Sequence, residues 1–291
     1  MPALSLVVCV YREGELLTRL LRATIGCYDD LVVVHDGPDT TGVRAVAESA
    51  GGRFFERPRA HQQEPHWPFA WQQARHDWIL RLDADELPSA ELKNWLENFC
   101  RGPEPGEDIS GFTCIWPLWN GRRAVSQRWP AGRSFLLHRQ RVRFFGMVEH
   151  TPVPDGRFEP LEMVLCHQPV RRSYGLANLL LRKQAYRWRA RIARSLLDMP
   201  EKLECWRWEN RPWPPLWEQI RERPLRTAAW RLIHGTLAGL RDQWRAEHRC
   251  WPFAAVSGPV HHALIALEYW RLRQLQARGR LESAHRWVFD E

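Results

Sequence analysis

The chain has 291 residues, of which 44% are hydrophobic and 26% are charged, a composition typical of folded globular proteins. This length allows one large domain or two modest ones, each with a sizeable hydrophobic core. The seven cysteines are odd in number and are never spaced as Cys-x-x-Cys, which argues against a disulfide framework and against a zinc knuckle.

The net charge of +8 is unevenly distributed along the chain. Residues 171–291 contain 23 Lys and Arg against 12 Asp and Glu, whereas residues 1–170 contain 19 against 22. A basic C-terminal part predicts a phosphate-bearing partner, such as a nucleic acid or an anionic membrane surface. Only three of the 42 basic residues are lysines, so an arginine-rich compositional bias without functional meaning explains the excess equally well.

The N-terminal sequence has no basic segment followed by a long apolar stretch, so we expect no signal peptide and a cytoplasmic protein. The longest stretch without formal charge, residues 250–267, contains two prolines, a serine and two histidines. Such a stretch is not typical of a membrane-spanning helix, so we expect no transmembrane segment.

The first hundred residues alternate between strand-like and helix-like patterns. Residues 4–10 and 31–35 are short apolar runs, and between them residues 15–25 place leucines at helical spacing. Continuous apolar character along both runs is typical of a parallel sheet covered by helices. The alternation continues with a helix at 41–50, a strand at 53–56, a helix at 68–76 and a strand at 78–82. This pattern predicts an α/β fold with its ligand site at the carboxyl ends of the strands.

The remainder of the chain predicts a second, mainly helical part. After a turn-rich connector at 101–108, four further strands are expected at 110–118, 134–138, 142–145 and 161–167. From Leu176 onward the pattern is helical, with a proline-rich interruption at 211–215. We therefore expect an α/β domain over residues 1–170 and a helical Arg- and Trp-rich region over residues 171–291.

Three polar clusters follow the predicted strands, and the third contains paired carboxylates. Asp83 and Asp85 come directly after a buried apolar strand, and they point the same way if that strand continues. Two carboxylates at such a position are costly unless a cation neutralises them. Oxygen ligands of this kind suit Mg²⁺ or Mn²⁺, whose remaining positions a diphosphate can fill.

The order and spacing of the clusters resemble family 2 glycosyltransferases of the GT-A fold. The matching segments read Cys9-Val-Tyr11-Arg-Glu13, then Val34-His-Asp36-Gly37, then Leu82-Asp83-Ala-Asp85-Glu86. Two positions depart from the family pattern: Arg12 replaces the usual asparagine, and His35 replaces the first aspartate.

The resemblance implies a GT-A domain that binds a nucleotide-sugar donor, a UDP-sugar in our prediction. It implies that Tyr11 lines the base pocket and that Glu13 and Asp36 contact the base or the ribose, with His35 in the same cluster. It further implies that Asp83 and Asp85 serve the metal and the donor diphosphate.

A narrower resemblance is to the bacterial branch that builds lipopolysaccharide cores, with a Gly-x-Val-His-Glu segment and a later strand ending in histidine. Here the segment is Gly146-Met-Val-Glu149-His150, with the last two residues inverted, and the strand ends at His167. We expect Glu149 to be the general base of an inverting transfer, with His150 as its alternative. His167 is expected to complete the metal shell, and Lys183 to neutralise a phosphate.

Ten of the 17 tryptophans lie after residue 187, interleaved with arginines, as in Trp230-Arg231 and Trp270-Arg271. This pattern fits an interfacial helix on a membrane, in which the rings lie at headgroup level. It also fits stacking on nucleic-acid bases, or simple packing of tryptophans under arginines. The sequence leaves these three interpretations open.

The leading functional hypothesis is transfer of a sugar to a lipid-linked or surface saccharide. An alternative is the same donor chemistry on a nucleic acid, such as a hydroxymethylated DNA base. A third, from another class, is a non-catalytic nucleotide-sugar-binding or surface-binding protein that retains the fold. The intact segment Asp83-Ala-Asp85-Glu86 argues against the third hypothesis.

Overall fold

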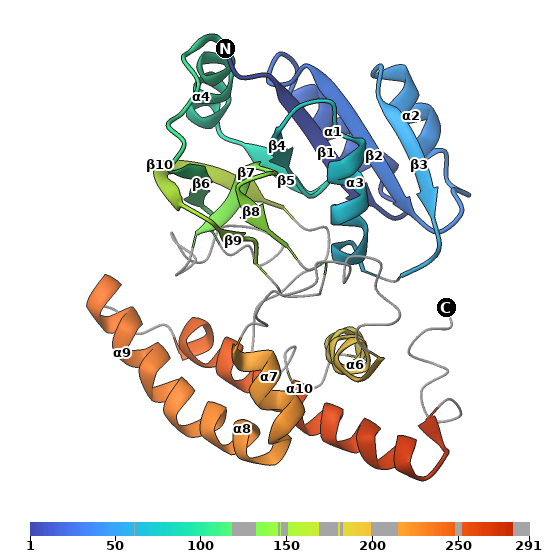
Figure 1. Ribbon diagram of the computed structural model, residues 1–291, viewed down its shortest axis with the longest axis vertical. Helices are drawn as coiled ribbons and strands as arrows, with labels where there is room; N and C mark the ends of the chain where they lie inside the picture. Colours follow the sequence, from blue (N-terminus) through green and yellow to red (C-terminus); the bar gives the residue numbers. More distant parts are fainter. Residues whose placement is uncertain are drawn as a thin grey trace. The chain divides into compact units, whose positions relative to one another are not determined.

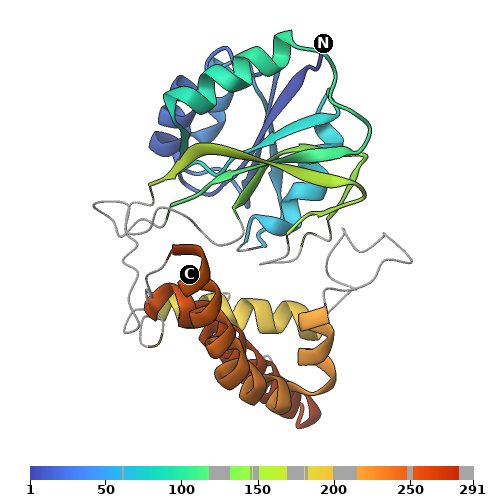
Figure 2. The same ribbon diagram turned by 90° about the vertical axis from the view of Figure 1, so that its left-hand side faces the viewer.

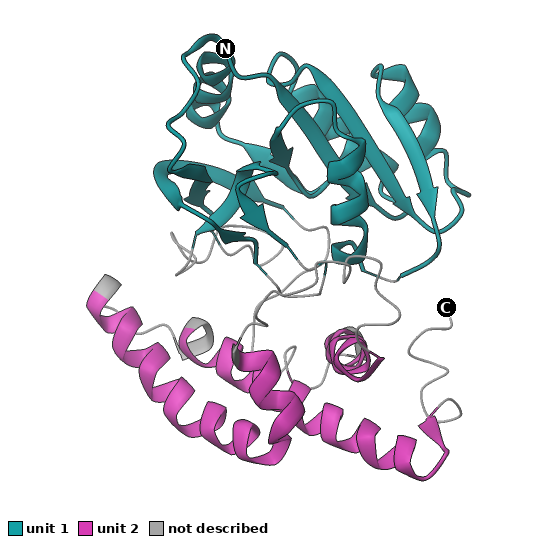
Figure 3. Ribbon diagram, viewed as in Figure 1, with its two compact units in different colours: residues 1–172 teal, residues 173–291 magenta. Residues whose placement is uncertain are grey.

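The computed structural model describes residues 1–60, 62–117, 132–144, 146, 151–168, 180, 183–198, 215–247 and 252–281, without the side chains of a few residues near helix ends, Lys183 among them. The chain divides into two compact units, Met1–Arg172 and Ser173–Glu291 (Figure 3).

The first unit is an α/β domain in which strands and helices alternate over its first half (Figure 1). In chain order, its elements are β1 (Leu4–Val10), α1 (Gly14–Ala23), β2 (Asp30–Asp36), α2 (Val43–Ser49), β3 (Arg53–Arg57), the short 3₁₀ helix η1 (Glu64–His66), α3 (Trp67–Gln73), β4 (Trp78–Arg81), β5 (Glu86–Pro88), α4 (Ala90–Arg101), β6 (Ile109–Ile115), β7 (Arg133–His138), β8 (Val142–Arg143), β9 (Val153–Pro154) and β10 (Arg157–His167).

Eight of these strands form one mixed, mostly parallel sheet in the order β3-β2-β1-β4-β7-β6-β10-β5. The first four are parallel, β7 runs antiparallel between β4 and β6, and β5 pairs antiparallel with β10 at the edge. The chain moves outward from β1 to β3 and then returns to β4 on the other side of β1. The carboxyl ends of β1 and β4 therefore flank a topological switch point, where open α/β sheets bind ligands.

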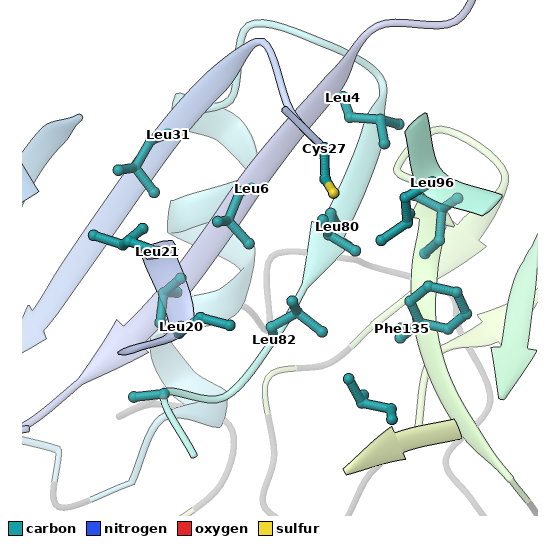
Figure 4. Packing of buried hydrophobic residues seen from close by; sticks show 14 of the residues in the cluster. Leu4, Leu6, Leu20, Leu21, Cys27, Leu31, Leu80, Leu82, Leu96 and Phe135 are labelled. Atoms are coloured by element: carbon teal, nitrogen blue, oxygen red, sulfur yellow. The ribbon is translucent and has the colours of Figure 1, made fainter. Parts of the chain in front are cut away.

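Alternate residues of the central strands face the two sides of this sheet. Leu4 and Leu6 of β1 belong to a buried cluster with Leu20 of α1, Leu80 of β4 and Leu96 of α4 (Figure 4). Helices α1, α2 and α4 cover that face, and α3 covers the other (Figures 1 and 2). Burying each leucine contributes roughly 1.5–3 kcal/mol, so this core fixes the strand ends that carry the polar clusters.

The predicted α/β fold is confirmed, and the strand predicted at 78–82 does not continue through the acidic cluster. Strand β4 ends at Arg81, and the backbone N–H of Glu86 donates to the carbonyl oxygen of Asp83 at 2.9 Å, which closes a turn. The chain then resumes as β5. Asp83 and Asp85 therefore lie in a tight turn, and the alternation of a strand does not orient them.

The second unit is helical, as predicted. Its described elements are α6 (Lys183–Asp198), α7 (Pro215–Glu222), α8 (Pro224–Trp230), the π-helical turn η3 (Arg231–Gly235), α9 (Thr236–Glu247) and α10 (Pro252–Ala277). Helix α10 packs against α6, α8, η3 and α9. Within the described part of the chain, no helix is long and apolar enough to cross a membrane.

Candidate functional site

The first strand-end cluster lies where β1 leaves the sheet. Tyr11 is partly buried, and the guanidinium carbon of Arg59 lies 3.2 Å from the centroid of its ring. The backbone N–H of Tyr11 lies 3.5 Å from Glu13 Oε2. Arg12 has a φ of 55°, in the left-handed region that asparagine adopts more readily than most residues. An asparagine at this position would therefore adopt this backbone conformation more readily than Arg12 does.

His35 is fully buried at the carboxyl end of β2. Its Nδ1 lies 2.7 Å from the carbonyl oxygen of Gly37, which can only accept, so Nδ1 carries the hydrogen. Its Nε2 lies 3.4 Å from the backbone N–H of Arg12. Gly37 has a φ of 95°, and a Cβ there would lie 3.2 Å from Arg59 Cδ. His35 thus contacts the backbone of both turns, at Arg12 beside Tyr11 and at Gly37 beside Asp36.

Both carboxylate oxygens of Asp36 are hydrogen-bonded. Its Oδ1 contacts His66 Nε2 at 2.9 Å and accepts from the backbone N–H of Ala60 at 2.5 Å. Its Oδ2 accepts from Arg59 Nη1 at 3.1 Å. Burial raises the pKa of Asp36, but the hydrogen bonds from His66 and Ala60 and the charge of Arg59 outweigh it, so that the pKa lies below its ordinary value. Asp36 is therefore a fixed carboxylate anion at neutral pH.

We expect the stability that Asp36 contributes through its ionisation to be lost in acid. Because the folded-state pKa is lowered, the contribution is fully present above the unfolded-state pKa of about 3.9 and disappears as the pH falls through the folded-state pKa. Below about pH 4, the free energy of unfolding in urea should therefore fall more steeply for the wild type than for Asp36→Asn. A difference between the two proteins that stays constant across this pH range would contradict the assignment.

The turn after β4 is organised by a carboxylate that is 0% exposed, that of Glu86. Its Oε2 accepts from the backbone N–H of Asp83 at 2.8 Å, and its Oε1 accepts from Trp116 Nε1 at 2.8 Å. The Nε atom of Arg133 lies 3.1 Å from Glu86 Oε1, and Arg133 Nη2 lies 3.1 Å from Asp83 Oδ2. Burial raises the pKa of Glu86, and Arg133 acts in the opposite direction. Arg133 therefore holds two neighbouring carboxylates in one place.

Asp85 lies on the other side of this turn, against the end of β10. Its Oδ2 lies 3.3 Å from Nε2 of His167. His167 is the register partner of Glu86 where β10 and β5 pair as antiparallel strands. The His167 ring stacks on Trp116, with centroids 4.4 Å apart and ring planes 20° apart. The stacking and the ladder together fix the imidazole beside the carboxylate.

The described residues fit a divalent cation as a partial ligand set. Asp85 and His167 offer an oxygen and a nitrogen in contact with one another, and Asp83 Oδ1 is buried without a hydrogen-bond partner among the described residues. Within the described residues, no three His, Cys, Asp or Glu side chains form a ready metal cage. A site of this kind suits Mg²⁺ or Mn²⁺, which keep several waters and take their remaining ligands from substrate phosphates.

The sequence-predicted residues differ in how far the structure describes them. Tyr11, Glu13, His35 and Asp36 lie at the ends of β1 and β2, and the set formed by Asp83, Asp85 and His167 lies around the turn after β4. Glu149 and His150 lie outside the described residues. Lys183 begins α6, and its side chain also lies outside them.

Four residues of the site could not be recognised as site residues from the sequence alone. Arg59 and His66 lie in the segment between β3 and α3, and they contact Asp36 only because the chain folds back over β2. Trp116 follows β6, and Arg133 begins β7. They reach Glu86 because β7 and β6 are inserted beside β4, an antiparallel arrangement that the strand pattern does not specify.

A model of Glycosyl transferase family 2 matches residues 5–150, half of the chain, and covers all three strand-end clusters. The chain belongs to glycosyl transferase family 2. This membership, together with the observed sheet, confirms the prediction of a glycosyltransferase with the GT-A fold.

Several solved structures are similar to this chain at low identity. The mannosyltransferase PcManGT from Pyrobaculum calidifontis, in complex with GDP-Man and Mn²⁺, is 16% identical over 92% of this chain and 87% of its own, with a TM-score of 0.48. TarS from S. aureus is 13% identical over 89% of this chain and 55% of its own, with a TM-score of 0.43. Glucosyl-3-phosphoglycerate synthase from Mycobacterium tuberculosis, in complex with Mn²⁺, UDP and glucosyl-3-phosphoglycerate, is 15% identical, with a TM-score of 0.30. The last match covers 40% of this chain and only 44% of the synthase.

Proposed function

We propose that this family 2 chain transfers a sugar from a nucleotide-sugar donor, a UDP-sugar, to an acceptor hydroxyl with the aid of Mn²⁺ or Mg²⁺. The observation that carries the proposal is the contact of Asp85 with His167 beside the Asp83–Arg133 ion pair. Carboxylate and imidazole ligands next to the switch point suit a cation that also binds a diphosphate.

In this proposal the ends of β1 and β2 bind the nucleoside. Tyr11 supplies an aromatic surface for the base. Arg59 contacts both the ring of Tyr11 and the carboxylate of Asp36. Asp36 and Glu13 accept hydrogen bonds from the base or the ribose, and His35 holds the turns in place. The fixed charge of Asp36 supports this role, because a carboxylate accepts but does not donate hydrogen bonds.

The other end of the donor lies at the acidic turn. Asp85 and His167 would hold the cation. Asp83 Oδ1, which is buried without a hydrogen-bond partner among the described residues, is a further oxygen of the same turn. A bound Mn²⁺ or Mg²⁺ would neutralise the charge that develops on the departing nucleoside diphosphate. Glu86 and Arg133 keep the backbone and side chain of Asp83 in position.

The transfer we propose is inverting. A base takes the proton of the acceptor hydroxyl while its oxygen bonds to the anomeric carbon, and the bond from that carbon to the diphosphate breaks. Glu149 is the proposed base and His150 the alternative, while Lys183 is proposed to neutralise a phosphate. For the acceptor we propose a lipid-linked or surface saccharide, supported by the resemblance of the Gly146–His150 segment to lipopolysaccharide-core enzymes.

The test is a thermal-shift screen of nucleotide sugars with and without Mn²⁺. One donor should raise the melting temperature when Mn²⁺ is present, because a ligand at 100 times its Kd stabilises the folded state by about 2.7 kcal/mol. The same donor should then release its nucleoside diphosphate when an acceptor saccharide is added. Stabilisation by a donor that no acceptor consumes would support a non-catalytic binding protein, and no stabilisation by any nucleotide sugar would contradict the proposal.

A further inference from the structure

Helices α8 and α9, joined through η3, form one continuous helical run in the second unit (Figure 1). This run exposes an apolar face. Ile233 is 59% exposed, Leu237 is 60% exposed and Trp244 is 58% exposed. Leu225 and Trp230 are each 49% exposed. Large apolar side chains exposed together are characteristic of interaction faces.

The spacing places these side chains on one side of the run. Leu225, Ile233 and Leu237 lie eight and four residues apart, and Trp244 follows seven residues later, which are the intervals of a helix face. The opposite side is buried: Thr227 and Gly235 are among its buried residues. Helix α10 contacts α8, η3 and α9, so the exposed face is the one turned away from the helical core.

Arginines border the apolar face. Arg226, Arg241 and Arg245 are all exposed. Arg241 Nε lies 2.9 Å from Oδ1 of the exposed Asp242. Arg241 lies four residues after Leu237, and Arg245 lies four residues after Arg241, which places both beside the apolar side chains. A basic border next to leucine, isoleucine and tryptophan is the composition of helices that lie in a membrane interface.

A basic groove adjoins the start of the same face. Its volume is about 490 Å³, and its described lining includes Arg223 and Arg226 of the α7–α8 region together with Trp270 and Arg273 of α10. None of the described lining residues is acidic. Three guanidinium groups around a tryptophan suit a phosphate headgroup whose glycerol or acyl portion rests on the ring.

We propose that the α8–η3–α9 face binds the surface of a bilayer that contains anionic phospholipids, and that the adjoining groove receives a lipid phosphate. The apolar side chains enter the interface, and the arginines meet the headgroups. This inference depends on the second unit alone, so its failure would leave the proposed sugar transfer untouched.

The aliphatic side chains favour a bilayer over a nucleic acid. Leu225, Ile233 and Leu237 form much of the exposed face, and none of them can stack on a base. Non-sequence-specific binding to single strands depends on aromatic platforms in a basic groove, whereas an interfacial helix gains energy from any apolar side chain that leaves water.

The experiment is co-sedimentation of the full chain with phosphatidylcholine vesicles that either contain or lack phosphatidylglycerol, at low and high salt. We expect binding only to the anionic vesicles, weakened by salt. Ile233→Ser is expected to weaken it several-fold, because a side chain that is 59% exposed no longer enters the interface. Arg226→Glu is expected to weaken it by at least about fivefold, since each arginine near such a surface contributes about that factor.

Two matched variants in the first unit serve as controls. Ile25 is 64% exposed, so Ile25→Ser removes the same side chain from an equally exposed place, and Arg22→Glu reverses an exposed charge there. Both controls should bind like the wild type, and thermal unfolding of each variant confirms folding. Absence of binding to anionic vesicles, equal losses in variants and controls, or sedimentation with duplex DNA in preference to vesicles would each overturn the proposal.

Discussion

Replacement of Asp85 by asparagine is expected to reduce kcat by roughly 10²- to 10³-fold, the effect of losing several kcal/mol of charge stabilisation by a cation. Asparagine keeps the size of the side chain but removes the negative charge that faces His167 at 3.3 Å. The measurement is the rate of nucleoside diphosphate release from the donor found by the thermal-shift screen, with a saccharide acceptor present.

Glu48→Gln is the control for this substitution, because Glu48 is an exposed carboxylate on α2 whose side chain is 56% exposed. It should turn over at the wild-type rate. If Asp85→Asn retained the rate of Glu48→Gln, Asp85 would have no part in the transfer, and the acidic turn would be a structural feature of the sheet edge.

Arg133→Met is expected to lower the free energy of unfolding by about 3–5 kcal/mol, the usual cost of leaving a buried charge without its partner. Arg133 is 21% exposed in its side chain and lies between Asp83 and the fully buried Glu86. Methionine fills much of the same volume, so the loss reports the charge and not a cavity. Urea denaturation monitored by circular dichroism measures the change.

The double variant Arg133→Met with Glu86→Gln separates the ion pair from the packing. Because glutamine carries no charge, the double variant should be more stable than the sum of the two single losses predicts. Arg44→Met removes the exposed pairs of Arg44 with Glu48 and Glu56 and should cost no more than about 1 kcal/mol. Additive losses at Arg133 and Glu86, or a loss at Arg133 no larger than at Arg44, would contradict the role given to Arg133.

The fold of the first unit could be predicted largely because its central strands are continuously apolar. The runs at 4–10, 31–35 and 78–82 correspond to β1, β2 and β4, which are buried on both faces. A buried parallel strand appears in the sequence as a continuous apolar run, which can be recognised without knowing the rest of the fold. Once the strands are predicted, their carboxyl ends are known, and the clusters at Tyr11 and Asp36 lie at those ends.

The arrangement around the acidic turn could not be predicted in the same way. Asp83 and Asp85 would share one face only if the strand continued, whereas the chain turns at Asp83 and Glu86, and their contacts are separate. Asp83 pairs with Arg133 and Asp85 with His167, residues that lie 50 and 82 positions away along the chain. Pairing across a mixed sheet depends on topology, which local patterns do not encode.

The departures from the family pattern became interpretable only with backbone geometry. Arg12 stands at a positive φ, and His35 uses both ring nitrogens to hold backbone groups of Arg12 and Gly37. The two unusual residues therefore contact one another. Comparison with a motif registers them only as two separate mismatches.

The cation site is tested most directly by a calorimetric titration of the identified nucleotide-sugar donor into the protein, first with Mn²⁺ and then after the metal has been removed with EDTA. We expect donor binding with Mn²⁺, a large loss of affinity in EDTA, and a similar loss in His167→Ala even when Mn²⁺ is present. Equal affinity with and without the metal, in both the wild type and His167→Ala, would contradict the assignment of Asp85 and His167 as the cation site.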